Sequence, residues 1–176
     1  MAKIRILPVL LFCCLSCFAQ ESEYQLKALF FEQFSRFVEW PASMDVQDTT
    51  KPFHISVLGK NPFGTLLHKT YKGQTIRNKS VRISYPATPA DIDTCHMLFI
   101  SSSLADNIQQ IIDQIKDKPI FTIGDTPGYA EAGVHLNLFQ QNNTIKFEMN
   151  ERAVHESGLN VSYVLFNLSK VVDPIE

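Results

Sequence analysis

The chain has 176 residues, of which 16 are Lys or Arg and 18 are Asp or Glu, so its formal net charge at pH 7 is −2. The basic residues form no block, which excludes the electrostatic footprint expected of a nucleic-acid-binding protein. The length suits one domain with a hydrophobic core of its own.

Residues 1–19 predict a secretory signal peptide. A basic start is followed by an apolar run over residues 6–15 and by small residues at Cys17 and Ala19, which favours cleavage after Ala19. The run is shorter than the roughly 20 residues of a membrane span. The mature domain would then comprise residues 20–176. A lipoprotein anchored through Cys17 is the alternative.

Cleavage would remove two basic residues and three of the four cysteines. The mature chain would keep 14 basic and 18 acidic residues, a net charge of −4, and Cys95 as its remaining thiol. A lone cysteine permits neither an internal disulfide nor a thiolate metal cluster. An intermolecular disulfide through Cys95 remains an open alternative.

Residues 21–41 predict an amphipathic helix that ends at Trp40–Pro41, because proline disfavours the helical conformation at the residue before it. So many aromatic residues indicate a helix that either packs on a large core or leaves apolar surface for a partner. The expected apolar side consists of Tyr24, Leu26, Ala28, Phe30, Phe31, Phe34, Phe37 and Val38.

Strand and helix patterns alternate after this helix. Strands are predicted at residues 53–58, 80–85, 97–101 and 119–123, and helices at residues 62–71 and 104–116. This alternation predicts a single α/β domain with a mainly parallel sheet and helices on both faces.

A C-terminal antiparallel hairpin is predicted from residues 134–141 and 144–150. Asn142 and Asn143 tolerate positive φ and suit a two-residue type I′ turn. Pairing Gln141 with Thr144 sets Leu138 opposite Phe147, and a one-residue slip would oppose apolar to charged side chains. Residues 151–172 then predict two helical pieces joined near Ser157–Gly158.

One face of this hairpin carries four polar residues: His135, Asn137, Glu148 and Asn150. Three interpretations remain open. The residues form a recognition surface, a hydrogen-bond network under the first helix, or a solvated face.

Two strand-end loops are candidate ligand sites, since open α/β sheets bind ligands at the carboxyl ends of their strands. Residues 59–64 lie between a strand and a helix, but Thr65 stands where a phosphate-binding loop has Lys. In residues 124–129, Asp125 is either a pocket carboxylate or a turn residue, and Tyr129 lies beside it.

The sequence offers little for catalysis. It has no Gly-x-Ser-x-Gly and no His-Glu-x-x-His pattern. Cys95 and His96 are too compact to be two ligands of one zinc ion. We therefore expect a protein that is not an enzyme and that needs no cofactor or metal.

Three segments together resemble the YfiR family of secreted bacterial proteins. They are residues 23–41, with Phe-Val-Glu-Trp-Pro at their end; residues 95–101 with 122–129; and residues 145–153 with 158–162. The resemblance implies a periplasmic α/β domain. It also implies a protein that restrains a membrane-bound diguanylate cyclase by binding its periplasmic part, in some cases as a homodimer.

The expected function is therefore periplasmic regulation of cyclic di-GMP signalling, and hence of attachment and biofilm formation, through a protein–protein interaction. The resemblance implies a membrane signalling protein as partner, with no transmembrane span in this chain. Tyr163 and Phe166, with Lys170, are candidate partner residues at helical spacing. The alternatives are a periplasmic small-ligand-binding domain that uses the loops near Gly59 and Asp125, and an unrecognised hydrolase. The family's cysteine pairs have no counterpart here.

Overall fold

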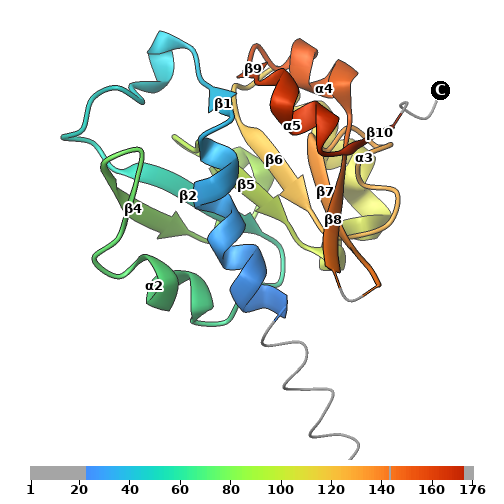
Figure 1. Ribbon diagram of the computed structural model, residues 1–176, viewed down its shortest axis with the longest axis horizontal. Helices are drawn as coiled ribbons and strands as arrows, with labels where there is room; N and C mark the ends of the chain where they lie inside the picture. Colours follow the sequence, from blue (N-terminus) through green and yellow to red (C-terminus); the bar gives the residue numbers. More distant parts are fainter. Residues whose placement is uncertain (1–22, 143, 173–176) are drawn as a thin grey trace, which may run out of the picture.

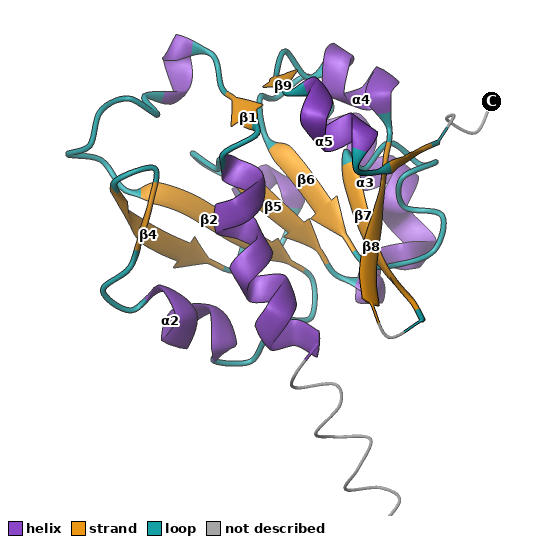
Figure 2. Ribbon diagram, in the orientation of Figure 1, coloured by secondary structure: helices purple, strands orange, loops and turns teal. Residues whose placement is uncertain are grey.

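The computed structural model describes residues 23–142 and 144–172, so the predicted signal peptide lies outside the described residues. The N-terminal helix runs through residues 23–35 and crosses the front of the sheet in Figures 1 and 2. The elements that follow it are β1 (Val38–Glu39), η1 (Ala42–Met44), β2 (Phe53–Leu58), α2 (Leu66–Tyr71), β3 (Thr75–Ile76), β4 (Lys79–Ser84), η2 (Pro89–Asp91), β5 (Met97–Ile100), η3 (Ser102–Asn107), α3 (Ile108–Ile115), β6 (Phe121–Gly124), β7 (Leu136–Gln141), β8 (Thr144–Met149), α4 (Glu151–Glu156), β9 (Asn160–Val161), α5 (Tyr163–Asn167) and β10 (Lys170–Val171).

The domain is α/β, but its sheet is mixed rather than mainly parallel. The eight-stranded order is β10-β8-β7-β6-β5-β2-β4-β3. The five neighbouring strands from β4 to β7 run parallel. Towards the two edges, β3 is antiparallel to β4 and β8 is antiparallel to β7. The prediction of parallel strands therefore holds for the interior, where helical crossovers connect them, and fails towards the edges.

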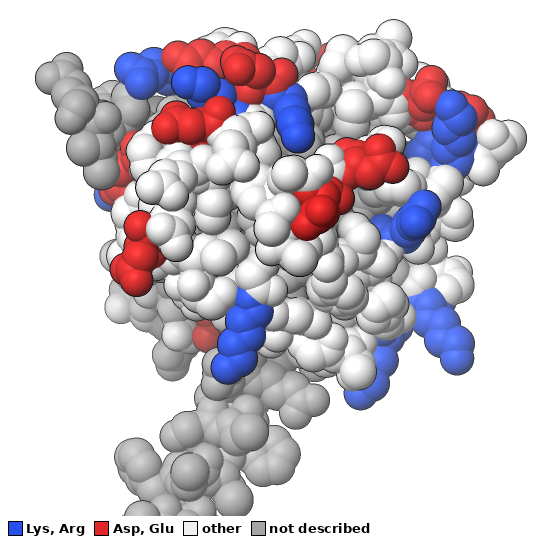
Figure 3. Space-filling view, turned by 180° about the vertical axis from the view of Figure 1, so that it is seen from behind, with Lys and Arg blue, Asp and Glu red and all other residues white. Residues whose placement is uncertain are grey.

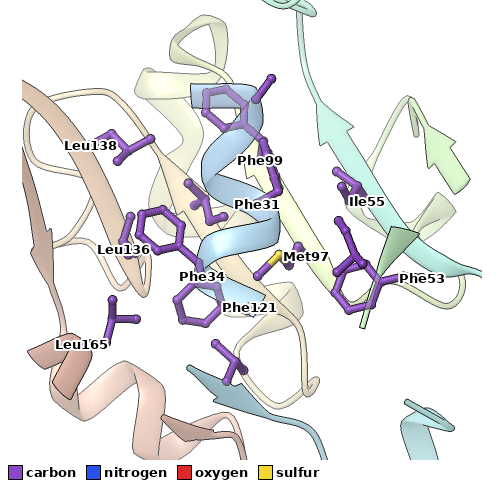
Figure 4. Packing of buried hydrophobic residues seen from close by; sticks show 14 of the residues in the cluster. Phe31, Phe34, Phe53, Ile55, Met97, Phe99, Phe121, Leu136, Leu138 and Leu165 are labelled. Atoms are coloured by element: carbon purple, nitrogen blue, oxygen red, sulfur yellow. The ribbon is translucent and has the colours of Figure 1, made fainter. Parts of the chain in front are cut away.

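Helices cover both faces of the sheet, as the alternating pattern predicted. On one face the N-terminal helix, α2 and α5 share a hydrophobic cluster with the strands. Phe34 lies near Phe121 and Leu136 in this cluster, and Phe31 lies near Phe99 (Figure 4). On the other face α3 contributes Ile111, Ile112 and Ile115 to a second cluster. The buried inner strands, such as β5 with all four residues buried, separate the two clusters.

The hairpin register agrees with the prediction. Gln141 pairs with Thr144 and Leu138 with Phe147. The backbone N–H of Asn150 donates to the carbonyl of His135 at 3.1 Å, which extends the same register. Asn142 has a φ of 51°, as the predicted turn requires. Asn143 lies outside the described residues, so the type I′ turn stays a prediction.

The N-terminal helix ends earlier than predicted. Residues 36–37 form a turn, and Val38 pairs as a strand with Val161 of β9. The guanidinium of Arg77 donates to the carbonyls of Ser35 and Val38 at 2.8 and 3.0 Å. These contacts satisfy carbonyls that a continued helix would have bonded internally, so tertiary pairing ends the helix before Pro41 does.

The predicted helix at residues 62–71 is also shorter than expected. The side chain of Asn61 accepts from the N–H of Phe63 at 2.9 Å and donates to the carbonyl of Gly64 at 3.0 Å. Gly64 has a φ of 54°, which no α-helix contains. This closed turn delays α2 to Leu66.

Two further predicted helical segments are interrupted. The segment at residues 104–116 consists of η3 followed by α3. The C-terminal segment contains α4 and α5 as predicted, and Gly158 follows α4 with a φ of 72°, which suits the predicted helix end. The two-residue strands β9 and β10 were not predicted, because two residues carry no detectable period.

Candidate functional site

A buried ion pair lies at the carboxyl end of β6. The ammonium of Lys27 lies 2.7 Å from Oδ2 of Asp125, and both side chains are about 5% exposed. The hydroxyl of Tyr24 donates to the same oxygen at 2.8 Å. Burial first, and then the Asp125 charge, raises the pKa of Tyr24 well above its ordinary value of 10. Asp125 therefore binds the N-terminal helix rather than facing an open pocket.

The carboxyl ends of the neighbouring strands are filled by other side chains. A Cβ on Gly59 would lie within 2.9 Å of Ser103 and Leu104, and one on Gly124 would lie 2.6 Å from the ring of Tyr129. The Tyr129 hydroxyl donates to the carbonyl of Ser101 at 2.8 Å. The strand-end edge predicted as a ligand site is thus occupied by the protein itself.

Two of the hairpin's polar residues form a buried hydrogen-bond chain. Asn137 accepts from the N–H of Thr126 at 3.0 Å and donates to Glu148 at 3.1 Å. The ammonium of Lys170 lies 3.6 Å from the other oxygen of Glu148. Of the three interpretations, the geometry favours a structural network, which connects the β6 loop to β10.

The other two, His135 and Asn150, bind the backbone around α4. Nδ1 of His135 lies 3.1 Å from the N–H of Thr122, and Nε2 lies 3.1 Å from the carbonyl of Ala153. Burial lowers the pKa of His135 from 6.5 to about 4, so the neutral ring accepts at Nδ1 and donates at Nε2. Oδ1 of Asn150 accepts from the N–H of Ala153 at 2.8 Å and caps α4.

These polar residues do not lie under the N-terminal helix, where one interpretation placed them. Leu136 and Leu138 of β7 belong to the cluster beneath that helix. Because alternate strand residues point to opposite faces, Asn137 points away from that cluster.

The predicted partner residues on α5 have opposite environments. Tyr163 is 72% exposed, whereas Phe166 is buried in the core beneath the N-terminal helix. Lys170 belongs to β10 rather than to the helix. The exposed residues of this C-terminal stretch include the apolar Val164, Leu168 and Val171, together with the polar Asn167 and Lys170.

The N-terminal helix presents a second, smaller apolar area. Leu26 is 43% exposed, contrary to the prediction that it faces inward, and Leu29 is 50% exposed. Lys27 takes the buried position instead, because Asp125 supplies a partner for its charge. A lysine inside an apolar stripe, between Tyr24 and Phe31, was the sequence signal that could have revealed this contact.

The thiol of Cys95 has a structural environment rather than a reactive one. The Cys95 thiol is buried and donates to the carbonyl of Met97 at 3.1 Å, and burial raises its pKa to about 12, which removes thiolate reactivity. Within residues 23–142 and 144–172, no group of three His, Cys, Asp or Glu residues is arranged to hold a metal ion. In the same residues, none of the helices has the length and apolar character needed to cross a bilayer.

Comparison with protein-family models identifies the family of this chain. Residues 24–170 match the model of the DUF4154 family, described as YfiR/HmsC-like. The chain belongs to this family, which confirms the resemblance found in the sequence.

Other comparisons are more distant. One similar solved structure is that of a conserved domain protein from Vibrio cholerae O1 biovar El Tor str. N16961, with a TM-score of 0.49 and 11% identity. The match covers 75% of this chain and 60% of that one. No curated protein matches the chain.

Proposed function

We propose that this protein is a periplasmic, non-enzymatic regulator that binds the periplasmic part of a membrane diguanylate cyclase and restrains it. Membership of the YfiR/HmsC-like family supports the signalling role. The predicted signal peptide at residues 1–19 supports export to the compartment where that part of a cyclase is accessible.

The observation that carries a protein–protein role is the apolar C-terminal surface, which we define as Tyr163, Val164, Leu168 and Val171. Their exposed fractions are 72, 53, 64 and 47%. Clustered apolar side chains at a surface mark interaction sites, because their exposure to water is unfavourable. The rear face carries charged side chains of both signs around a broad area without Lys, Arg, Asp or Glu (Figure 3).

The position of β10 strengthens this surface as a contact site. Among the described strands, β10 ends the sheet order and pairs on one side with β8. An edge strand can pair with an extended segment of another protein. The side chain of Lys170, which is 67% exposed, provides a polar group beside the apolar residues, in keeping with the polar rim of protein interfaces.

The role is tested by measuring cyclic di-GMP in a clean deletion strain, where we expect the level to rise and attachment to increase. Leu168→Asp, which introduces a charge on the C-terminal surface, should reproduce the deletion while the protein remains folded. The matched control is Tyr85→Asp, because Tyr85 is 43% exposed and follows β4 near the opposite end of the sheet. An unchanged cyclic di-GMP level on deletion, in a strain that expresses both this protein and a periplasm-facing cyclase, would refute the proposal.

A further inference from the structure

Strand β4 has an outer edge that is paired along only part of its length. Residues 81–84 pair with residues 53–56 of β2 on one side. On the other side β3 pairs with Lys79 and Ser80, and none of the described strands lies beside residues 81–84 there. These four residues form no backbone hydrogen bond with a described loop or helix either. The outward N–H and C=O groups of this stretch are therefore available to another strand.

The side chains of this stretch continue the two faces of the sheet. Val81 and Ile83 are half-buried and pack against the cluster beneath the N-terminal helix. Arg82 and Ser84 point to the opposite face, where both are exposed. Tyr85, which follows in the same alternation as Val81 and Ile83, is 43% exposed. The apolar layer thus reaches the sheet edge with its last side chains incompletely covered, because no further strand lies beside them.

The opposite end of the sheet has a comparable open edge. β10 pairs with the last two residues of β8, and none of the described strands pairs with residues 144–147 on that side. Ile145 and Phe147 are half-buried against the same cluster, whereas Lys146 is exposed. Each open edge therefore places one basic residue between two half-buried apolar residues, and this basic residue is Arg82 in β4 and Lys146 in β8.

The two basic residues disfavour two of the three ways in which these edges could pair between copies of the chain. If β4 of one copy pairs with β8 of another so that all the apolar residues face one another, Arg82 lies opposite Lys146. If β8 pairs antiparallel with itself so that Ile145 faces Phe147, the two Lys146 ammonium groups lie opposite one another. Like charges at facing positions destabilise strand pairing. The head-to-tail pairing of β4 with β8 would also leave an open edge at each end and add copies without limit.

The third arrangement, β4 against β4, has a register that avoids this repulsion. Facing residues of an antiparallel pair point to the same face, so the middle of the open stretch allows a twofold axis beside Arg82 or beside Ile83. An axis beside Arg82 sets the two guanidinium groups opposite one another. An axis beside Ile83 brings the two Ile83 side chains together and sets Val81 opposite Tyr85 and Arg82 opposite Ser84. We propose that this protein forms a homodimer through antiparallel β4 strands in the register centred on Ile83.

The dimer goes beyond the proposed regulatory function and does not depend on it. In Figure 1, β4 lies at the end of the sheet away from β8 and α5, so the dimer leaves the C-terminal surface accessible. Tyr85→Asp places a carboxylate opposite Val81 of the second copy, and it should weaken dimerisation without changing the restraint of the cyclase. Failure of one proposal therefore leaves the other standing.

Sedimentation velocity of the full exported chain tests the dimer. We expect a reversible monomer–dimer equilibrium at concentrations up to about 1 mM, since a small interface holds a weak complex. Ile83→Lys brings two ammonium groups together at the twofold axis and should raise the dissociation constant at least about tenfold. Ile145→Lys is the matched control, because Ile145 is half-buried in the same way at the other edge. It should leave the dissociation constant within about threefold, since distant sites act independently.

Cysteine cross-linking tests the register and remains decisive if Ile83→Lys does not fold. Facing Cα atoms of antiparallel strands lie about 4.5–5.5 Å apart, which is within the reach of a disulfide. Ile83→Cys should therefore form a disulfide-linked dimer on oxidation, whereas Arg82→Cys, whose counterpart is Ser84, should form little. Cys95 is buried and does not compete.

The proposal is overturned if the unmodified chain stays monomeric at these concentrations or if a folded Ile83→Lys variant dimerises as tightly as the unmodified protein. It is also overturned if a folded Ile145→Lys variant weakens the dimer as much as Ile83→Lys does, because the β8 edge would then take part. Arg82→Cys that cross-links as readily as Ile83→Cys would refute the register.

Discussion

The ammonium of Lys27 and the carboxylate of Asp125 form an ion pair at 2.7 Å, with both side chains about 5% exposed. This pair ties the N-terminal helix to the loop after β6. A charge that remains in such a place without its partner is strongly unfavourable.

Lys27→Met should therefore destabilise the protein by about 3–5 kcal/mol, because Asp125 keeps a buried charge without its counter-ion. Urea unfolding at pH 7 measures the change. The matched control is Arg36→Ala on the same helix, whose ion pair with Glu32 is exposed and should contribute less than about 0.5 kcal/mol. Equal losses in the two variants would contradict a structural role for the buried pair.

Phe34→Ala should cost about 3–5 kcal/mol, because it removes a ring that is 4% exposed and packs against Phe147 at 5.4 Å between centroids. Leu29→Ala on the same helix should change the free energy of unfolding by less than about 0.5 kcal/mol, since Leu29 is half exposed. The two variants separate core packing from helix propensity in one denaturation experiment. A nearly neutral Phe34→Ala would instead make that face an interaction surface.

Stability should fall as the pH drops from 6.5 towards 4. Burial lowers the pKa of both His96 and His135 from 6.5 to about 4, so between these values the unfolded chain binds more protons than the folded one. Each histidine then removes at most about 1.4 kcal/mol per pH unit. Above pH 6.5 this contribution is fully present.

Urea unfolding at pH 7 and pH 5 tests this dependence in the unmodified protein and in a His155→Gln control. His155 is 73% exposed, so its removal should leave the difference between the two pH values unchanged. A stability that is the same at pH 7 and pH 5 would show that the two buried rings do not stay neutral in the folded state.

The N-terminus of the protein purified from cells should begin at Gln20, as the sequence of residues 1–19 predicts. Intact-mass measurement distinguishes this form from a chain that begins at a lipidated Cys17. Finding Met1 on most of the protein would contradict export.

The parts of the fold that the sequence predicted are those with a repeating period or a continuous run of β-forming residues. The β7–β8 register followed from alternating apolar residues on either side of Asn142. β2 was predicted at its observed bounds from a run of β-forming residues that ends at Gly59. The two-residue strands β1 and β9 have no period to detect. They depend on a distant pairing, and that pairing also determines where the N-terminal helix ends.

The roles of the candidate site residues were harder to predict, because the sequence does not show which distant residues form their hydrogen bonds and ion pairs. Asp125 and Asn137 had the composition of a ligand site, but the groups that bind them, Lys27 and Thr126, lie elsewhere in the sequence. Lys79 was also not identified as a buried residue from the sequence, because its hydrogen-bond partners are distant in the sequence. It is fully buried, and its ammonium donates to the carbonyls of Asp45 and Asp48, which fixes the loop before β2.

The pairing of β1 with β9 joins Val38 to Val161, near the other end of the chain. During synthesis the N-terminal helix emerges first, whereas the strands that cover Phe31 and Phe34 follow later. The aromatic side chains of this helix therefore remain exposed to solvent until most of the polypeptide has emerged. Contacts between residues so far apart in the sequence slow folding and favour aggregation. The incompletely synthesised chain is consequently the form of this protein most exposed to aggregation.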